Sequence, residues 1–162
     1  METLKKSEIL KLIISLLIPL IAGFIGSVAT ISSIPTWYTI LAKPAWAPPN
    51  WLFGPVWTTL FILMGIALFL VWRKGIWRMD VKIAISIFGI QLFLNVLWSV
   101  IFFGLQSLTG GLIEIVFLWI TILVTIIMFY RISKVAGILL LPYIAWVTIA
   151  SYLTYTVYLL NI

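Results

Sequence analysis

The sequence predicts an all-α integral membrane protein, a bundle of five transmembrane helices, and three observations support this fold class. The 162 residues are 64% hydrophobic and only 9% charged, whereas a soluble domain is about 45–50% apolar and about 25% charged. The mean hydropathy is +1.26. The apolar residues also form five runs of about 20 residues, the length that crosses a bilayer. Because lipid cannot satisfy an irregular backbone, each run has to be a helix.

The five runs give the elements and their order. They lie at about residues 9–31, 49–72, 81–103, 112–130 and 135–160, within a single membrane domain that takes up residues 1–162. Polar and turn-forming residues separate the later runs at 73–80, 105–111 and 131–134. The last break is so short that the fourth and fifth helices are expected to be antiparallel neighbours.

The first run has a second interpretation. Lys5 and Lys6 precede an apolar stretch that ends in small residues, which is also the pattern of a signal peptide. The apolar run continues to Ile31, however, and Gly23 and Gly26 lie on a small-residue face that allows a neighbouring helix to come close. These features favour a retained first helix.

Nine of the ten Lys and Arg residues lie on one side of the predicted bundle, and Lys43 alone lies on the other. The positive-inside rule then predicts a multi-pass protein of the cell membrane, with a cytoplasmic N-terminus and an external first loop and C-terminus. The basic residues form no continuous face, so the lipid bilayer is the expected partner and nucleic acid is not. The chain has no cysteine and no histidine. The usual zinc and haem ligands are therefore missing, and neither a metal site nor a required cofactor is predicted.

Residues 37–57, WYTILAKPAWAPPNWLFGPVW, contain four tryptophans and four prolines, with Lys43 as their only charge. Proline restricts the unfolded chain and so lowers the entropy lost on ordering. The first loop is therefore expected to form a stiff lid over one mouth of the bundle, with Trp57 inside the second helix as part of the wall below it.

Three of the predicted helices carry a stripe of residues at helical spacing. The stripes are Trp57, Phe61, Met64 and Leu68; Gln91, Asn95, Trp98 and Phe102; and Pro142, Trp146, Ala150 and Leu153. Aromatic stripes are typical of bundle packing, but polar amides such as Gln91 and Asn95 face the bundle interior or a cavity. Hydrogen bonds between helices, worth about 0.6–2 kcal/mol each, are their structural alternative. Pro142 is expected to kink the fifth helix and to open space beside Trp146.

Glu114 is the only acidic residue within a predicted span. We expect it about one turn inside the end of the fourth helix, within reach of water or Lys43. An interfacial position or a structural hydrogen bond is the favoured interpretation, and a role in proton coupling is the alternative.

The chain also contains three ordered blocks of residues. The first is Trp37, Tyr38, Leu41, Lys43, Pro44, Trp46, Pro48, Pro49, Trp51, Phe53, Pro55, Val56 and Trp57; the second is Leu94, Asn95, Trp98, Phe102, Phe103 and Gly104; the third is Leu141, Pro142, Tyr143, Trp146, Ala150 and Leu153. Together they resemble the translocator protein or tryptophan-rich sensory protein family (TspO/MBR), in its bacterial form. With the length and the five spans, the resemblance covers essentially the whole chain.

The resemblance implies a homodimer that binds protoporphyrin IX or similar tetrapyrroles and hydrophobic drug-like ligands of the benzodiazepine type, and acts in tetrapyrrole transport, sensing or turnover. It also implies a pocket formed by Tyr38, Trp57, Asn95, Trp98, Trp146, Ala150 and Leu153. Light-dependent porphyrin degradation, an activity of some bacterial members, would involve Trp57 and Trp146. Gly110 stands in place of a tryptophan of mammalian members. No basic residue follows Tyr155 and Tyr158, which argues against a preference for sterols.

The combined candidate ligand-binding residues are Tyr38, Lys43, Trp57, Phe61, Gln91, Asn95, Trp98, Trp146, Ala150 and Leu153. A flat porphyrin is expected between the indole rings of this set, with a propionate near Lys43. Ferric haem could be ligated only by weaker groups such as Tyr38, Tyr143 or Met64, so metal-free protoporphyrin is expected to be preferred over haem. A membrane receptor or carrier for tetrapyrroles is the favoured function. A light- and oxygen-dependent porphyrin-degrading enzyme and a small proton-coupled exporter using Glu114 are the alternatives.

Overall fold

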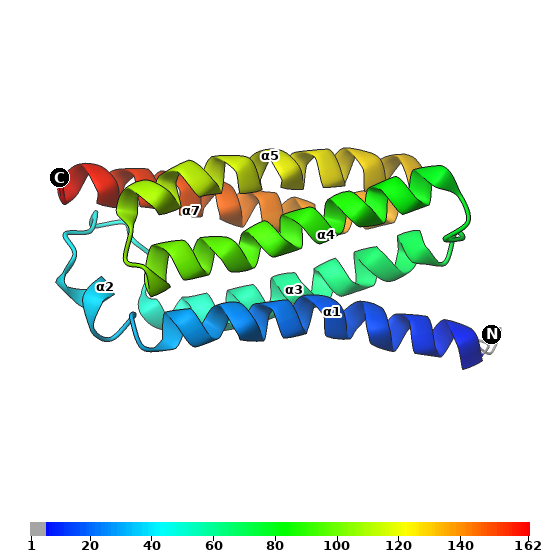
Figure 1. The fold of residues 1–162 in the computed structure, drawn as a ribbon, viewed down its shortest axis with the longest axis horizontal. Helices are drawn as coiled ribbons and strands as arrows, with labels where there is room; N and C mark the ends of the chain where they lie inside the picture. Colours follow the sequence, from blue (N-terminus) through cyan, green and yellow to red (C-terminus); the bar gives the residue numbers. More distant parts are fainter. Residues whose placement is uncertain (1–5) are drawn as a thin grey trace.

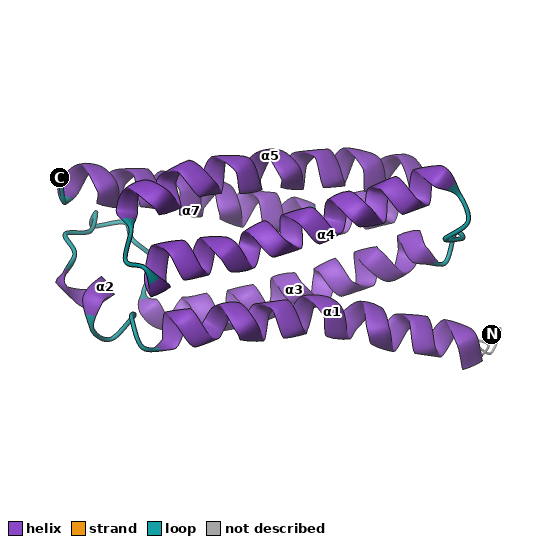
Figure 2. Cartoon of the chain, viewed as in Figure 1, coloured by secondary structure: helices purple, strands orange, loops and turns teal. Residues whose placement is uncertain are grey.

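Long helices dominate the computed structural model, which describes residues 6–162. Five segments are long and apolar enough to cross a membrane: Lys6–Ile31, Asn50–Trp72, Met79–Gly104, Leu108–Ile132 and Lys134–Leu160. They run side by side in an elongated bundle, and a long first loop and shorter turns join them at its two ends (Figures 1 and 2). The five predicted transmembrane helices are therefore confirmed, and the protein is a multi-pass membrane protein.

The elements, in chain order, are α1 (Lys6–Ile31), α2 (Trp37–Ile40), α3 (Asn50–Trp72), α4 (Met79–Ser99), the π-helical turn η1 (Val100–Gly104), α5 (Leu108–Ile132), α6 (Lys134–Leu139) and α7 (Leu141–Leu160). The first loop, residues 32–49, contains α2 and lies at the same end of the bundle as the C-terminus (Figure 1). We call this the first-loop end. The opposite, basic end holds the start of α1 and the turn after Trp72.

Two helices begin or end differently from the prediction because a serine side chain caps a backbone amide. The Ser107 hydroxyl accepts from the Gly110 amide at 3.0 Å, so the predicted break at 105–111 closes at Ser107 and α5 begins at Leu108. Likewise the predicted break at 131–134 shrinks to Ser133, which caps α6. Caps of this kind satisfy amides that a helix leaves unpaired in its first turn.

The last span is interrupted at Leu140, between α6 and α7. Pro142 lies in the first turn of α7, where its missing N–H has no helical partner to lose. The predicted kink is thus a short break, one turn on the N-terminal side of Trp146. By contrast, Pro19 and Pro55 lie inside α1 and α3, which continue past them.

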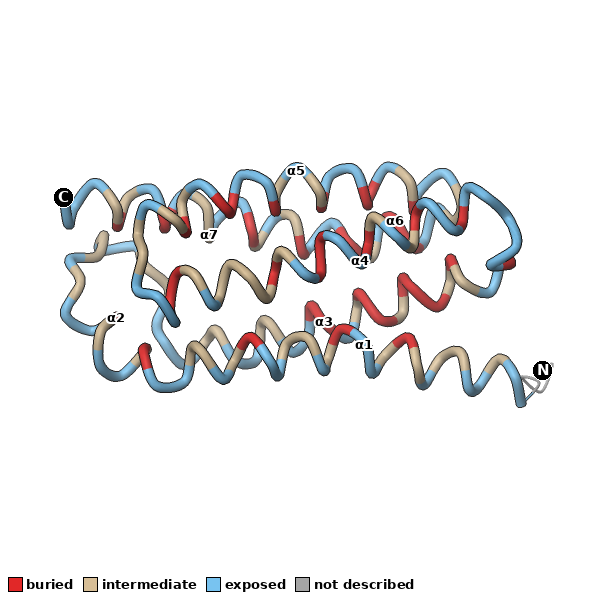
Figure 3. The backbone as a smooth tube through the Cα atoms, viewed as in Figure 1, coloured by how far each residue is buried: buried red, intermediate tan, exposed pale blue. Residues whose placement is uncertain are grey.

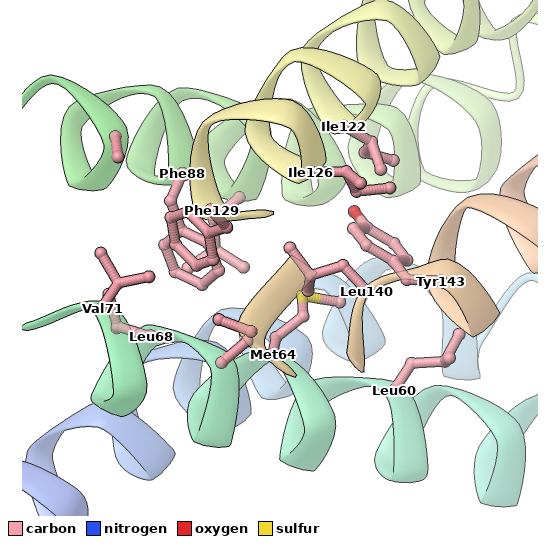
Figure 4. Packing of buried hydrophobic residues seen from close by; sticks show 14 of the residues in the cluster. Leu60, Met64, Leu68, Val71, Phe88, Ile122, Ile126, Phe129, Leu140 and Tyr143 are labelled. Atoms are coloured by element: carbon pink, nitrogen blue, oxygen red, sulfur yellow. The ribbon is translucent and has the colours of Figure 1, made fainter. Parts of the chain in front are cut away.

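The helices form a ring: α1 packs on α3 and α4, α4 on α5, α5 on α6 and α7, and α3 on α6. The core is densest in the basic half, where Phe88 and Phe129 stack with ring centroids 5.5 Å apart and Met64 and Tyr143 are almost fully buried (Figure 4). Buried positions follow the inward faces of the helices, and α1 has the fewest among the long helices (Figure 3). The first-loop half is less filled, and the candidate site lies there.

Candidate functional site

A cavity of about 420 Å³ lies in the first-loop half of the bundle, between α1, α3, α4 with η1, and α7. Its volume falls in the range of about 300–1,000 Å³ that is usual for small-molecule sites. Seven aromatic residues supply much of the wall: Phe24, Phe53, Trp57, Phe61, Trp98, Phe103 and Trp146. The arrangement suits a flat apolar ligand, whose faces pack well against aromatic rings.

The aromatic walls are braced by further ring contacts. Trp57 stacks on Phe61 with centroids 5.6 Å apart and meets Tyr143 edge-on at 6.2 Å. Trp98 stacks on Phe102 at 5.0 Å. Centroid separations of about 4.5–7 Å are those of favourable aromatic pairs, so the rings are held in place before any ligand arrives.

Asn95 brings a polar amide to the cavity wall. Its Nδ2 donates to the Tyr143 hydroxyl at 2.9 Å, and that hydroxyl donates to Gln91 Oε1 at 2.8 Å. Gln91 itself does not line the cavity and is 1% exposed. Both amides therefore face the interior as predicted, and both take part in the interhelical hydrogen bonds that were their structural alternative.

The indole N–H groups of Trp98 and Trp146, which both line the cavity, differ in their hydrogen bonding. Trp98 Nε1 donates to the Gly111 carbonyl at 3.2 Å, which ties α4 to α5. Trp146 Nε1 is buried and has no hydrogen-bond partner within residues 6–162. A buried donor without a partner is costly, so the Trp146 indole lowers the stability of this wall rather than tying it to a neighbouring helix.

The first loop covers the cavity at the end of the bundle. Tyr38, in α2, is 3% exposed and lies edge-on to Phe103 and Phe53, at 5.7 and 6.5 Å between centroids. Burial raises the pKa of its phenol. Ser33 Oγ donates to the Phe103 carbonyl at 2.7 Å. The loop thus packs on residues that line the cavity, while only Ile34 of the loop lines it directly.

Lys43 holds the loop rather than facing the cavity. Its Nζ donates to the carbonyls of Tyr38 and Leu41 at 2.6 and 3.1 Å and lies 4.7 Å from the centroid of the Tyr38 ring. Two of the three ammonium hydrogens are thereby used.

Not all the predicted site residues meet in one place. Six line the cavity: Trp57, Phe61, Asn95, Trp98, Trp146 and Ala150. Four do not line it: Tyr38, Lys43, Gln91 and Leu153. Sequence reasoning missed the contribution of α1, where Gly23, Ser27 and Thr30 line the cavity. The small-residue face of α1 is the signal that could have found them, but the same pattern is typical of a packing face.

Glu114 lies about one turn inside the helix, as expected, but its expected contact with Lys43 is not made. Because α5 begins at Leu108, Glu114 lies in its second turn, 6% exposed. Neither carboxyl oxygen has a hydrogen-bond partner within the described residues, and Lys43 is committed to the loop carbonyls. Glu114 is thus buried without a hydrogen bond in the described part of the chain, and it does not line the cavity. In the described part of the chain no group of His, Cys, Asp and Glu is arranged to hold a metal ion.

Comparison with known proteins shows which family this chain belongs to. Residues 15–160 match the TspO/MBR family, a stretch that includes most of α1. The chain is 48% identical over 154 residues to the tryptophan-rich protein TspO of Archaeoglobus fulgidus, covering 95% of this chain and 99% of that protein. It is 34% identical over 143 residues to the human translocator protein, covering 88% and 85%. It is 33% identical over 126 residues to the tryptophan-rich sensory protein of Cereibacter sphaeroides, covering 77% of each. The fold, the tryptophan-rich first loop and these matches agree: the chain belongs to the TspO/MBR family.

Proposed function

We propose that this protein is a membrane receptor or carrier for tetrapyrroles, with protoporphyrin IX as the leading candidate, and that it also accepts other flat hydrophobic molecules such as benzodiazepine-type drugs. The observation that carries the proposal is the aromatic cavity within the bundle, with Trp57, Trp98 and Trp146 in its wall. The names translocator and sensory protein borne by relatives fit a role in tetrapyrrole transport, sensing or turnover. No cofactor is required for binding of this kind.

The chemistry of a porphyrin matches the site in two respects. Its macrocycle is flat and apolar, and indole rings supply matching surfaces. Its two propionates need water or a cation, and Lys43 lies in the first loop beside Tyr38. One N–H of the Lys43 ammonium remains beyond the two that bind carbonyls, and we assign it to a propionate.

The proposal also includes the orientation of the protein in the membrane and its assembly into a homodimer. Lys11, Arg73 and Lys82 lie toward the basic end, opposite the first loop, so the positive-inside rule favours a cytoplasmic basic end in the cell membrane. The first loop and the C-terminus then face outward. A homodimer and a single membrane domain remain predictions from the family resemblance.

The test is a protoporphyrin titration of the detergent-purified protein, followed by the shift of the porphyrin absorption band. Trp57→Phe and Trp98→Phe are expected to weaken binding by about 1 kcal/mol each, or about fivefold. Trp77→Phe is the matched control, because Trp77 is 78% exposed in the turn at the basic end. A flat titration of the unmodified protein would refute the proposal.

A second function is favoured by the fact that Trp57 and Trp146 line the same cavity. Indoles beside a photosensitiser can support radical chemistry with molecular oxygen and need no general base. Such an enzyme would bleach the porphyrin band under light in air, and Trp146→Phe would abolish the bleaching while leaving binding in the dark. Equal bleaching by the variant and the unmodified protein would exclude it.

A further inference from the structure

The wall of the cavity between α1 and α3 is open to the outside of the bundle. Phe24 and Ile31 line the cavity, yet they are 71% and 69% exposed. Gly54 and Thr58 of α3 line it as well and are also exposed. Residues that both line a cavity and lie on the surface mark its mouth. Because all four belong to membrane-spanning helices, this mouth opens sideways.

α1 and α3 approach closely near the middle of the bundle, and the mouth lies nearer the first-loop end. At Gly65 an added Cβ would lie 2.8 Å from the Leu16 Cα, and at Gly23 it would lie 2.4 Å from the Phe61 ring. At Gly54, in the first-loop half, a Cβ would meet nothing within 4 Å. Phe24 and Ile31 are seven residues apart, so the mouth extends about 10 Å along α1.

The rim of the mouth suits an apolar molecule. Three hydroxyl groups lie there, and each donates to a carbonyl of its own helix: Ser27 to Phe24 at 2.7 Å, Thr30 to Gly26 at 3.0 Å and Thr58 to Gly54 at 2.9 Å. A ligand without hydrogen-bonding groups can pass them without leaving a donor unpaired. A hydrated ligand finds no compensation for the water that it loses.

Side-chain contacts also cross two other approaches to the cavity. At the first-loop end, Ala42 is hydrogen-bonded to Asn161 and Trp46 stacks on Tyr152 at 5.2 Å. Between α3 and α7 there is a shallow groove that shares only Trp146 with the cavity. The Trp146 ring, in edge contact with Phe53 at 6.0 Å, closes that side.

We propose that apolar ligands enter and leave this cavity laterally, from the bilayer, between the first-loop halves of α1 and α3, and not through the first loop. The inference rests on the proposed ligand-binding function and adds its route. The bilayer is the source of the ligand, since the mouth lies between two membrane-spanning helices and its rim hydroxyls are already bound to their own helices.

The test compares two helical glycines whose missing side chains both face open space. Gly54→Trp places a ring over the mouth, and Gly89→Trp is the matched control, because Gly89 of α4 also has nothing within 4 Å of an added Cβ and does not line the cavity. Each variant is reconstituted in phosphatidylcholine vesicles that carry protoporphyrin dimethyl ester, which lacks the charged propionates. The association and dissociation rates are then followed through the porphyrin absorption band.

Gly54→Trp is expected to slow both association and dissociation, each by about tenfold, because an obstructed mouth acts on both directions. Gly89→Trp is expected to match the unmodified protein. Unchanged rates in Gly54→Trp would overturn the lateral route, as would a loss of affinity with unaltered dissociation. Failure of the unmodified protein to bind at all would instead refute the proposed function.

A second variant tests the same proposal independently, in case Gly54→Trp does not fold. The chain has no cysteine, so Thr58→Cys carries the only thiol and can be labelled in detergent with a bulky maleimide. The labelled protein is expected to show the slow rates and the unlabelled variant the normal ones. Phe93→Cys, on a 65% exposed position of α4, is expected to show normal rates in both states. Equal rates for labelled and unlabelled Thr58→Cys would contradict the proposal.

Discussion

The side chain of Asn161, next to the last residue, forms a paired hydrogen bond with the backbone of Ala42 in the first loop. The Ala42 amide donates to Asn161 Oδ1 at 3.0 Å, and Asn161 Nδ2 donates back to the Ala42 carbonyl at 2.9 Å. The same Nδ2 donates to the Val157 carbonyl at 2.7 Å. The end of α7 therefore holds the first loop in place over the first-loop end of the bundle.

Asn161→Ala removes this fastening and is expected to loosen the first loop. Hydrogen exchange at Ala42 and nearby loop amides should become about tenfold faster, because each lost hydrogen bond is worth about 1 kcal/mol. Asn50→Ala, at the exposed start of α3, is the control and should leave exchange unchanged. If ligands enter laterally, the porphyrin association rate stays normal in Asn161→Ala. Unaltered loop exchange would show that the Asn161 contact does not hold the loop.

Tyr143→Phe is expected to destabilise the protein, because the Tyr143 hydroxyl is the shared partner of Asn95 and Gln91. Its loss leaves two buried amides without that partner, and each buried unsatisfied group costs about 1–3 kcal/mol. The measurement is the thermal unfolding temperature in detergent. Tyr155→Phe, at a position 47% exposed, should leave that temperature unchanged. Equal unfolding temperatures in the two variants would contradict a stabilising role for the hydrogen-bonded amides.

Lys43→Ala tests whether the Lys43 ammonium pairs with a propionate or only holds the first loop. If it pairs with a propionate, the variant binds protoporphyrin up to about fivefold more weakly at low salt, the range of about 0.2–1 kcal/mol for an exposed ion pair. Binding of protoporphyrin dimethyl ester, which lacks the carboxylates, should then be unaffected. An equal loss for both ligands would mean that Lys43 acts only by holding the loop through the Tyr38 and Leu41 carbonyls.

Ferric haem is expected to bind without a strong axial ligand from the protein. Tyr38, Tyr143 and Met64 are the axial candidates, and none of them lines the cavity. The chain contains no histidine or cysteine. The absorption spectrum of the complex should therefore lack the bands of nitrogen or thiolate ligation, and metal-free protoporphyrin should bind at least as tightly. A spectrum of nitrogen ligation by the protein would contradict the expectation.

The parts of this architecture that sequence reasoning found are those that lipid enforces. Hydropathy located the five spans because the bilayer core admits few other structures, and helical spacing placed Gln91 and Asn95 on an inward face. Their partner Tyr143 was beyond reach, since periodicity assigns a face but not the residue opposite, which lies 52 and 48 positions away along the chain.

The parts that were missed depend on local caps and on tertiary contact. The pair Gly110 and Gly111 suggested a break, but the Ser107 cap starts α5 before them. On α1, a small-residue face has the same sequence pattern whether it packs against a helix or borders a cavity. Gly26 does both: a Cβ added there would lie 3.3 Å from the Ser99 hydroxyl oxygen of α4, and the residue also lines the cavity.

Glu114 distinguishes a binding protein from a proton-coupled exporter. A receptor or carrier does not need its carboxyl, so Glu114→Gln should bind protoporphyrin normally, and porphyrin uptake into vesicles should not respond to an imposed proton gradient. Glu114→Leu should raise the unfolding temperature, because it removes a buried polar group with no partner, worth about 1–3 kcal/mol. Glu8→Gln is the control, since Glu8 pairs with Lys11 and Arg73 at 3.1 and 3.4 Å and its loss should lower stability slightly. Gradient-driven uptake that Glu114→Gln abolishes would establish the exporter instead.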